Sequence, residues 1–479
     1  MGKAELCFMS ISEASGLIAG GELSPVELVQ AHLDRISHTE PRLNSFITLL
    51  EEQSLESARA AEREIQKSGA RGPLHGVPVA LKDLYYTKGV RTTVGSQILR
   101  DFVPDYDAAV VERFSDAGAV LLGKLQMHEF AFGATSENPH YGPGHNPWDT
   151  ERVTGGSSGG SGSSVAAGQA MATLGSDTGG SVRIPSALCG IVGLKPTYGL
   201  VSRYGVYPLC WSLDTVGPMT RSVRDAALVM NAIAGPDARD PSSSDRAPED
   251  FASRLGRPID GLRIGIPQEH YFDLVDAEVA DAVMAAARVL EGQGAVVEQV
   301  SIPMLGNVAA ISNTIMLSEA AEVHLEHLRD RGDQFDPEVR DRLEPGATIP
   351  AVQYVRAQRA RSAYCEQVDR AMATVDVLLA PTCPVGAPKI GEPTITVAGR
   401  TEPKGPTLSR LTRPWNLYGG PAISVPCGLT SERLPIGLQL AGRPFEDALL
   451  LQIANAYEQA SGWEGLGARG WQTPKQGSA

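Results

Sequence analysis

The sequence lacks long apolar segments. No stretch approaches the roughly eighteen consecutive apolar residues that a transmembrane helix requires, so we expect no membrane-spanning segment. The opening residues, 1–16, contain no apolar core of the kind found in secretory signals. We therefore expect a cytoplasmic protein.

Positive charge is also in short supply. The chain holds 42 Lys and Arg residues against 56 Asp and Glu residues, which gives a formal net charge of −14. Such an excess of negative charge argues against a protein that coats nucleic acid or binds a membrane through a basic surface. We expect neither a nucleic-acid partner nor a membrane partner.

Cysteine is scarce and scattered. The cysteines include no C-x-x-C pair, which removes the simplest zinc and dithiol sites. We predict no metal site and no cofactor, and we expect reduced, mostly buried thiols. The six cysteines are Cys7, Cys189, Cys210, Cys365, Cys383 and Cys427.

The apolar residues that are present indicate alternating strands and helices. The order strand, helix, strand is expected over 77–81, 107–118 and 119–122, and it recurs over 262–266, 277–292 and 296–302. This rhythm is typical of an α/β fold with helices on both faces of a sheet. Near the N-terminus, Ser24 and Pro25 have the residue types that begin a helix, and a second helix is expected over 51–67.

The C-terminal half continues this pattern. We expect strands over 375–380, 422–425 and 436–440 and a closing helix over 447–460. Two segments, 235–250 and 384–410, hold many Pro, Gly and polar residues without clear periodicity, so we expect loops there.

The most unusual stretch covers residues 152–186, which are dominated by Gly and Ser. Apolar runs at 165–167 and 171–174 interrupt the small residues, whereas a flexible linker is uniformly polar. We interpret the stretch as two tight glycine-rich turns joined by a buried helix or strand. Glycine in such turns lets backbone N–H groups approach a reacting atom closely.

Three short motifs compete for this stretch. Residues 155–159 satisfy G-x-S-x-G, the nucleophile elbow of α/β-hydrolases, which also needs a downstream acid and histidine; His270, His324 and His327 are the only histidines that follow. A phosphate loop needs a lysine after its glycines, and none is present. Val165 stands where a dinucleotide fingerprint requires its last glycine. All three hypotheses are disfavoured.

Another pattern is far more specific. Lys82 ends an apolar strand, Ser157 lies in the first glycine turn and Ser181 in the second. With their flanking residues they resemble the amidase signature family, serine hydrolases that cleave amides with a Ser–Ser–Lys triad. The resemblance rests on four motifs in the family's order: GVPVALKD (76–83), GGSSGGS (155–161), GSDTGGSVRIPS (175–186) and GLKPTYG (193–199).

The resemblance implies a catalytic role for each residue of the triad. Ser181 would be the acylated nucleophile, Ser157, after a cis peptide bond, would bridge it to Lys82, and Lys82 would be the base. The oxyanion hole would consist of the backbone N–H groups of Thr178, Gly179, Gly180 and Ser181.

The resemblance also implies a fold and a division of the chain. It implies a single large α/β domain with a mixed central β-sheet covered by helices on both faces. Residues 1–70 would form an N-terminal helical layer packed on the core. Residues 71–235 would form the signature core with the catalytic residues, and residues 236–479 would complete the same domain and supply the loops of the substrate cleft.

This mechanism makes a demand on Lys82. A serine hydroxyl is a poor nucleophile until a base takes its proton, and lysine is a base only when neutral. Lowering its pKa from about 10.4 to about 7.5 costs about 4 kcal/mol, and burial supplies such a shift. Asp83 is adjacent in sequence, but on a strand its side chain points to the opposite face.

Further residues are assigned supporting roles. We expect Asp177 and Arg183 to form an ion pair that holds the second turn, and Ser158 to support the triad. For substrate binding we propose residues beside the expected cleft, with the last two on the leaving-group side: Met127, Phe132, Tyr204 and Trp211.

Other marked residues have less specific interpretations. His324 and His327 lie three residues apart on an expected helix, but no third metal ligand is evident, so we expect them on a solvated surface. Met127 and Phe132 share the segment LQMHEFAFG with Phe130, which periodicity places in the core. Trp415 and Asn416 lie in an expected loop that could cover the cleft.

Two branches of the family compete. FGATSENPHYGPGHNPWD (132–149) and LKPTYGLVSRYGVYPL (194–209) look much like the A subunit of glutamyl-tRNA(Gln) amidotransferase, which produces ammonia from glutamine for a partner subunit. Two departures count against it. Ile184 replaces the glutamine usual after the arginine of the second turn, and MLSEAAEVHLEHL (316–328) replaces an expected segment rich in tyrosine and arginine.

We therefore predict a stand-alone amidase, a monomer or homodimer, that acts on small apolar or aryl amides and could also cleave esters or carbamates. The amidotransferase subunit is the alternative. A third hypothesis, a non-catalytic binding scaffold, is disfavoured because all three triad positions are intact.

Overall fold

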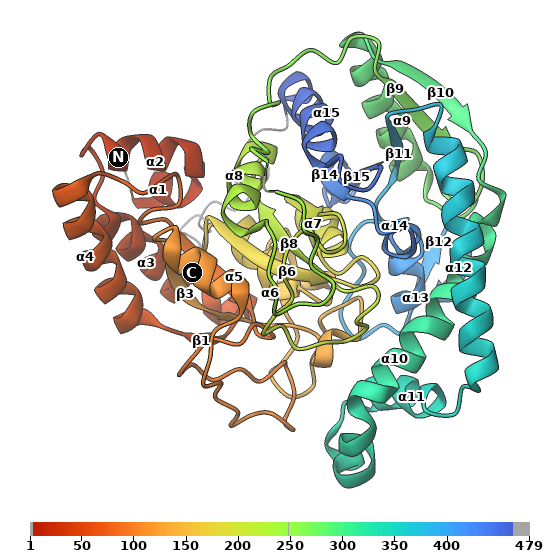
Figure 1. Cartoon of the computed structure of the whole chain (residues 1–479), viewed down its shortest axis with the longest axis horizontal. Coiled ribbons are helices and arrows are strands. Elements are labelled where there is room, and N and C mark those ends of the chain that lie inside the picture. The colour runs from red at the N-terminus through yellow and green to blue at the C-terminus, as the bar shows by residue number, and fades with distance from the viewer. Residues whose placement is uncertain (1–2, 248, 463–479) are drawn as a thin grey trace, which may run out of the picture.

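A computed structural model describes residues 3–247 and 249–462 (Figure 1). Its core is one mixed sheet of eleven strands in the order β1-β3-β2-β6-β8-β7-β14-β15-β11-β9-β10. In chain order these strands are β1 (Phe46–Leu49), β2 (Pro78–Lys82), β3 (Val120–Leu125), β6 (Ala172–Asp177), β7 (Val192–Lys195), β8 (Thr215–Thr220), β9 (Arg263–Pro267), β10 (Val296–Val300), β11 (Val377–Pro381), β14 (Ala422–Leu429) and β15 (Pro435–Gly442).

Helices cover this sheet on both faces, as the sequence predicts. Helices α6 and α7 pack against each other and against central strands, while α8, α9 and α15 form a second packed group on strands of the same sheet. The helices are α1 (Lys3–Phe8), α2 (Ile11–Ala19), α3 (Pro25–Leu43), α4 (Glu51–Ser68), α5 (Ala109–Asp116), α6 (Gly159–Ala166), α7 (Arg183–Cys189), α8 (Val223–Ile233), α9 (Ala277–Gly292), α10 (Val308–Arg331), α11 (Pro337–Gly346), α12 (Ala351–Met372), α13 (Lys404–Ser409), α14 (Arg413–Tyr418) and α15 (Asp447–Ser461).

Local sequence signals explain several of these elements. The Ser24 side chain caps α3 by accepting hydrogen bonds from the backbone N–H groups of Val26 and Glu27, and Pro25 occupies the first helical position. Helix α9 covers the predicted 277–292, and α15 begins at the predicted Asp447. Among the described residues, no helix is both long and apolar enough to cross a bilayer.

Three regions differ from the sequence prediction. Residues 384–410, expected as a loop, contain the hairpin β12 (Thr394–Val397) and β13 (Arg400–Pro403) followed by helix α13. Strand β1 extends the sheet from within the expected helical layer, where its short mixed pattern has no strong signal. A second small hairpin, β4 (His145–Asn146) and β5 (Asp149–Val153), precedes the glycine-rich stretch.

The sheet order positions the glycine-rich stretch. Strands β2 and β6 are parallel neighbours, with Leu81 paired to Leu174. Since carboxyl ends of parallel strands meet at one edge, Lys82 at the end of β2 lies beside the turn that follows β6. Helices α10 and α11 project from the body of the molecule, at the lower right of the view (Figure 1).

Candidate active site

Lys82 is fully buried and surrounded by hydroxyl groups. Its Nζ lies 2.7 Å from Ser157 Oγ and 2.8 Å from Ser176 Oγ. The Gly156–Ser157 peptide bond is cis, as the family resemblance implies. The structure therefore brings the expected base and the expected bridging serine into direct hydrogen-bond contact, although they lie 75 residues apart.

The surroundings of Lys82 favour a neutral amine. Burial lowers the pKa of Lys82 to about 7, against the opposing influence of the Asp214 and Asp177 carboxylates. Asp83, its sequence neighbour, faces a different cation. The Asp83 carboxylate lies 3.3 Å from Lys124 Nζ, so it forms an ion pair away from Lys82, as strand alternation predicts.

The first glycine turn and helix α6 pack closely against neighbouring backbone. A Cβ placed on Gly160 would lie 2.4 Å from the Ser45 carbonyl oxygen and 2.7 Å from the Gln126 backbone nitrogen. No side chain fits in that gap. The predicted helix or strand between the two turns is both: helix α6 is followed by strand β6.

Asp177 organises the second glycine turn. Its carboxylate accepts hydrogen bonds from the N–H groups of Gly180 (2.8 Å) and Val182 (3.2 Å) and pairs with Arg183 at 2.9 Å. Although burial opposes it, this interaction with the Arg183 guanidinium holds the pKa of Asp177 well below its usual range. Asn416 donates to the same carboxylate at 2.8 Å. The predicted ion pair is thus the centre of a buried network.

That network affects the expected oxyanion hole. The Gly180 N–H is engaged by Asp177. Within residues 3–247 and 249–462, the N–H groups of Thr178, Gly179 and Ser181 donate to no protein acceptor. The structure therefore leaves three of the four expected donors available to a substrate oxygen.

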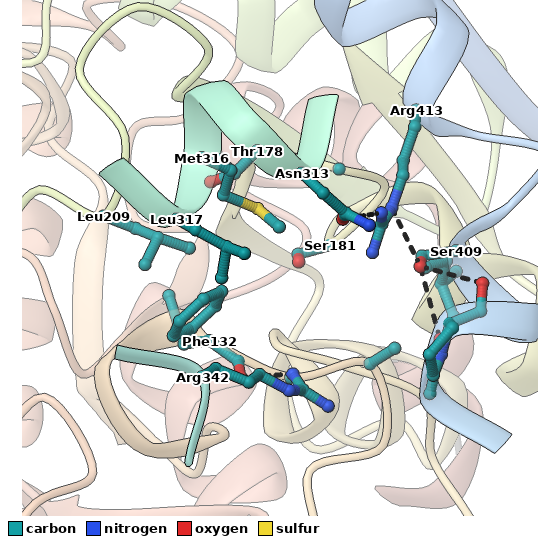
Figure 2. A pocket seen from close by; sticks show the side chains of 17 residues that line it. Phe132, Thr178, Ser181, Leu209, Asn313, Met316, Leu317, Arg342, Ser409 and Arg413 are labelled. Atoms are coloured by element: carbon teal, nitrogen blue, oxygen red, sulfur yellow. Dashed lines mark hydrogen bonds between the residues drawn. The ribbon is translucent and has the colours of Figure 1, made fainter. Parts of the chain in front are cut away.

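Ser181 opens onto a cavity of about 210 Å³ (Figure 2). Its hydroxyl makes no hydrogen bond with any described residue, so it is free to turn toward a molecule in the cavity. The walls come from the segment 131–134, from the second glycine turn and the start of α7, from Leu209, and from α10, α11, α13 and α14. They are Ala131, Phe132, Gly133, Ala134, Thr178, Gly179, Ser181, Ile184, Leu209, Asn313, Met316, Leu317, Arg342, Gly405, Pro406, Ser409 and Arg413.

The predicted substrate residues are only partly brought to this cavity. Phe132 lines it, whereas Met127 is buried in the core, and the Asn138 amide donates to its carbonyl at 2.9 Å. Tyr204 and Trp211 line a separate surface hollow of about 190 Å³, where Trp211 is 55% exposed. Trp211 and Tyr204 are therefore outside the wall of the Ser181 cavity.

Other sequence predictions need correction. His324 is buried rather than solvated, because its ring packs 4.2 Å from the centre of the Phe130 ring; His327 is partly exposed. Trp415 and Asn416 belong to helix α14 and are buried, so they do not form a loop over the cleft. In the described part of the chain, no cluster of three His, Cys, Asp or Glu side chains could hold a metal ion.

Supporting residues fall into a predicted and an unpredicted group. Ser158 donates a long hydrogen bond of 3.4 Å to the Ser176 carbonyl. Ser176 itself was not predicted, although its place five residues before Ser181 was a usable signal. Asp214, which accepts from the Thr178 hydroxyl at 2.5 Å, and the cavity arginines lie far from the motifs, and no sequence signal marks them.

The fold and the cavity define a hydrolase of carbon–nitrogen bonds. A family model described as Amidase matches residues 27–451, and the chain belongs to this family.

Relatives and solved structures extend the similarity to nearly the whole chain. The chain is 44% identical over 480 residues, 95% of its length and 98% of the relative's, to the A subunit of glutamyl-tRNA(Gln) amidotransferase from Carboxydothermus hydrogenoformans. It is similar to a structure described as a vestigial protein complex that reveals the evolutionary origins of an s-triazine catabolic enzyme (TM-score 0.91, 39% identity, 94% of this chain and 98% of the other). It also resembles an amidase crystal structure (TM-score 0.86, 34% identity, 94% and 99% covered).

Proposed function

We propose that this protein is an amidase that cleaves small amides through an acyl-enzyme on Ser181, with Ser157 and Lys82 as its proton relay. The observation that carries the proposal is the buried contact of 2.7 Å between Lys82 Nζ and Ser157 Oγ, at a lysine whose pKa is lowered by burial to about 7. A fraction of this amine is neutral near pH 7, and only the neutral form can take a proton.

Acylation begins when Ser181 Oγ attacks the amide carbon. Its proton passes to Ser157 Oγ while the Ser157 proton passes to Lys82 Nζ, and the carbonyl oxygen becomes an oxyanion. The N–H groups of Thr178, Gly179 and Ser181 are the available donors to that oxygen, and each such donor contributes roughly 3–4 kcal/mol in comparable sites. The C–N bond then breaks, and the relay returns the proton to the departing nitrogen.

Deacylation repeats the relay with water. Water attacks the acyl carbon, its proton travels through Ser157 to Lys82, and the ester bond to Ser181 breaks as the proton returns to Ser181 Oγ. The acid is released. The same steps would cleave an ester, and a carbamate would leave a carbamoyl or alkoxycarbonyl group on Ser181.

A labelling experiment tests this proposal. A fluorophosphonate should modify Ser181 in the wild-type protein and not in Ser181→Ala, as measured by mass spectrometry of the intact chain. Ser181→Ala should lose amide turnover by several orders of magnitude with an unchanged urea midpoint. Retained turnover in that variant would remove the nucleophile assignment.

The glutaminase component of an amidotransferase is the second candidate. It is favoured by the identity of 44% to amidotransferase relatives over nearly the whole chain. It would require protein partners, which a stand-alone hydrolase does not. Glutamine hydrolysis that appears only with co-expressed partner chains and tRNA would support it, whereas amide turnover by the purified chain alone would support the stand-alone enzyme.

A further inference from the structure

The cavity beside Ser181 carries an unbalanced positive charge. Two guanidinium groups, of Arg342 and Arg413, face it from different helices (Figure 2). Its described wall contains no Asp, Glu, Lys or His. A cavity made for the apolar or aryl amides expected from the sequence has no need of two arginines, because removing guanidinium groups from water is costly.

The two arginines differ in their own pairing. Arg342 forms an ion pair with Glu338 one turn away on α11 and donates to the Phe132 carbonyl at 2.9 Å, so its charge is balanced by the protein. Arg413 has only neutral partners: Nη1 donates to Asn313 Oδ1 and Nε donates to Ser409 Oγ at 3.1 Å. No carboxylate of residues 3–247 or 249–462 pairs with Arg413, and its Nη2 has no protein acceptor.

Arg413 is held directly beside the second glycine turn. A Cβ on Gly179 would lie 3.5 Å from Arg413 Cγ, so the arginine stem passes in van der Waals contact over the expected oxyanion donors. Asn313 on α10 and Ser409 on α13 fix the guanidinium from two sides. A planar guanidinium that is held in one orientation and keeps N–H groups unpaired is the arrangement that binds carboxylates with high specificity.

We propose that Arg413 binds a carboxylate carried by the substrate, so that the preferred substrates are small amides with a net negative charge and no ammonium group. The inference rests on the proposed function, since it concerns the same cavity. An ammonium group, as in glutamine, would find no acidic partner in the described cavity wall. The volume of about 210 Å³ is below the roughly 300–1,000 Å³ of sites for drug-sized ligands, which favours a short acid amide.

The test compares amides that differ in one group. Malonamate, succinamate and glutaramate are each paired with the amide in which a methyl group replaces the carboxylate: propionamide, butyramide and valeramide. For the best-fitting length, kcat/KM for the acid should exceed that for its neutral partner by about a hundredfold, because the neutral amide leaves the buried guanidinium without its charged partner. Glutaramate should also be hydrolysed faster than glutamine.

Variants locate the effect. Arg413→Met should reduce the ratio of acid to neutral amide to about one, mainly through a higher KM for the acid, and Arg413→Lys should give an intermediate ratio. Arg340→Gln is the control, because Arg340 is exposed and paired with Glu344 on the same helix as Arg342. It should leave the ratio unchanged.

The outcomes separate this inference from the proposed function. Equal or faster turnover of the neutral amides at every length would overturn the inference and leave the amidase intact. No turnover of any of the six amides by a protein whose Ser181 still reacts with fluorophosphonate would overturn it as well. A protein whose Ser181 does not react with fluorophosphonate contradicts the proposed function instead.

Discussion

At the scale of single residues, the charge state of Lys82 decides whether the site can work. Its amine is enclosed by Ser157 and Ser176, and its nearest sequence neighbour, Asp83, is held by Lys124. An ordinary lysine with a pKa of about 10.4 would be almost fully protonated near pH 7. In the proposed relay, burial is therefore the property that allows Lys82 to act as the base, and the two hydroxyls are its hydrogen-bond partners.

We expect kcat/KM for a neutral amide to rise about tenfold per pH unit below pH 7 and to level off above it. The sign follows from the lowered pKa of Lys82, about 7, because the active form is the deprotonated amine, which accumulates as pH rises. Initial rates on butyramide between about pH 5.5 and 8.5 measure it. Lys82→Arg, which stays charged, should lose orders of magnitude, whereas Lys88→Arg at an exposed position should not. A flat profile would argue against a titrating lysine.

At the scale of elements, close backbone approach holds helix α6 and the first glycine turn in place. Gly160 on α6 faces the backbone of Ser45 and Gln126, whereas Gly16 on α2 has no neighbour within 4 Å of an added Cβ. These two helical glycines therefore have opposite roles: one is required by packing and the other only lowers helix stability.

Gly160→Ala should destabilise the protein by about 1–3 kcal/mol, because its methyl group would overlap main-chain atoms that cannot move independently. Gly16→Ala should stabilise it by up to about 0.5–1 kcal/mol, since alanine restricts the unfolded chain and favours the helix. Urea midpoints of both variants give the comparison. Equal midpoints would show that the backbone around α6 gives way.

Helix α10 is joined to the second glycine turn through the buried carboxylate of Glu319. Glu319 accepts hydrogen bonds from the Ser212 N–H (3.0 Å), the Ser212 hydroxyl (2.7 Å) and the Tyr354 hydroxyl (2.8 Å). The loop that contains Ser212 also contains Asp214, which receives the Thr178 hydroxyl at the second turn. The helix that carries Asn313 and Met316 into the cavity is thus tied to the expected oxyanion donors.

Glu319→Gln should therefore lower stability by about 1–3 kcal/mol, because hydrogen bonds to a charged group are lost from a buried site. It should also raise KM, since the cavity wall loses its anchor. Glu322→Gln, at an exposed position on the same helix, is the matched control. Thermal unfolding together with kcat and KM on succinamate measures both effects. A Glu319→Gln protein indistinguishable from the Glu322→Gln protein would mean that α10 is held by packing alone.

At the scale of the whole molecule, one continuous sheet joins distant parts of the chain. Arg183, fully buried, donates to the Thr412 carbonyl and to Gln439 as well as to Asp177, so the second turn is tied to strand β15 and to the segment before α14. The cavity consequently combines residues from 131 to 413 of the sequence. Reagents in solution therefore have little access to side chains in the interior of the described residues.

Thiol reactivity measures that restriction. All six cysteines are free, and five of them are buried, with Cys365 partly exposed. Burial also raises the pKa of Cys7 to about 11 and of Cys383 to about 12, which suppresses the reactive thiolate. A thiol reagent at neutral pH should modify at most Cys365 in the native protein and all six cysteines in guanidinium. Rapid native reaction of more than one thiol would contradict this packing.

The sequence by itself determined the class of protein and much of the fold. The motifs around Lys82, Ser157 and Ser181 are local and specific, because each describes a tight turn or strand end that few residue types can form. Helices such as α9 were predictable for the same reason, since a helix face repeats over neighbouring residues. The sequence also predicted that the side chains of Asp83 and Lys82 face opposite sides of the strand, because the alternation of side chains along a strand is a local rule.

Only the tertiary structure decided which side chains share the cavity. Arg342 and Arg413 lie on different helices far from the motifs, and their approach to Ser181 depends on how α11 and α14 pack against the second turn. Tertiary packing also places Tyr204 and Trp211 in a separate hollow and buries His324 against Phe130, contrary to the sequence prediction. The motifs that mark the family lie in short segments, whereas the charge of the cavity beside Ser181 arises from contacts between distant segments, which no local pattern records.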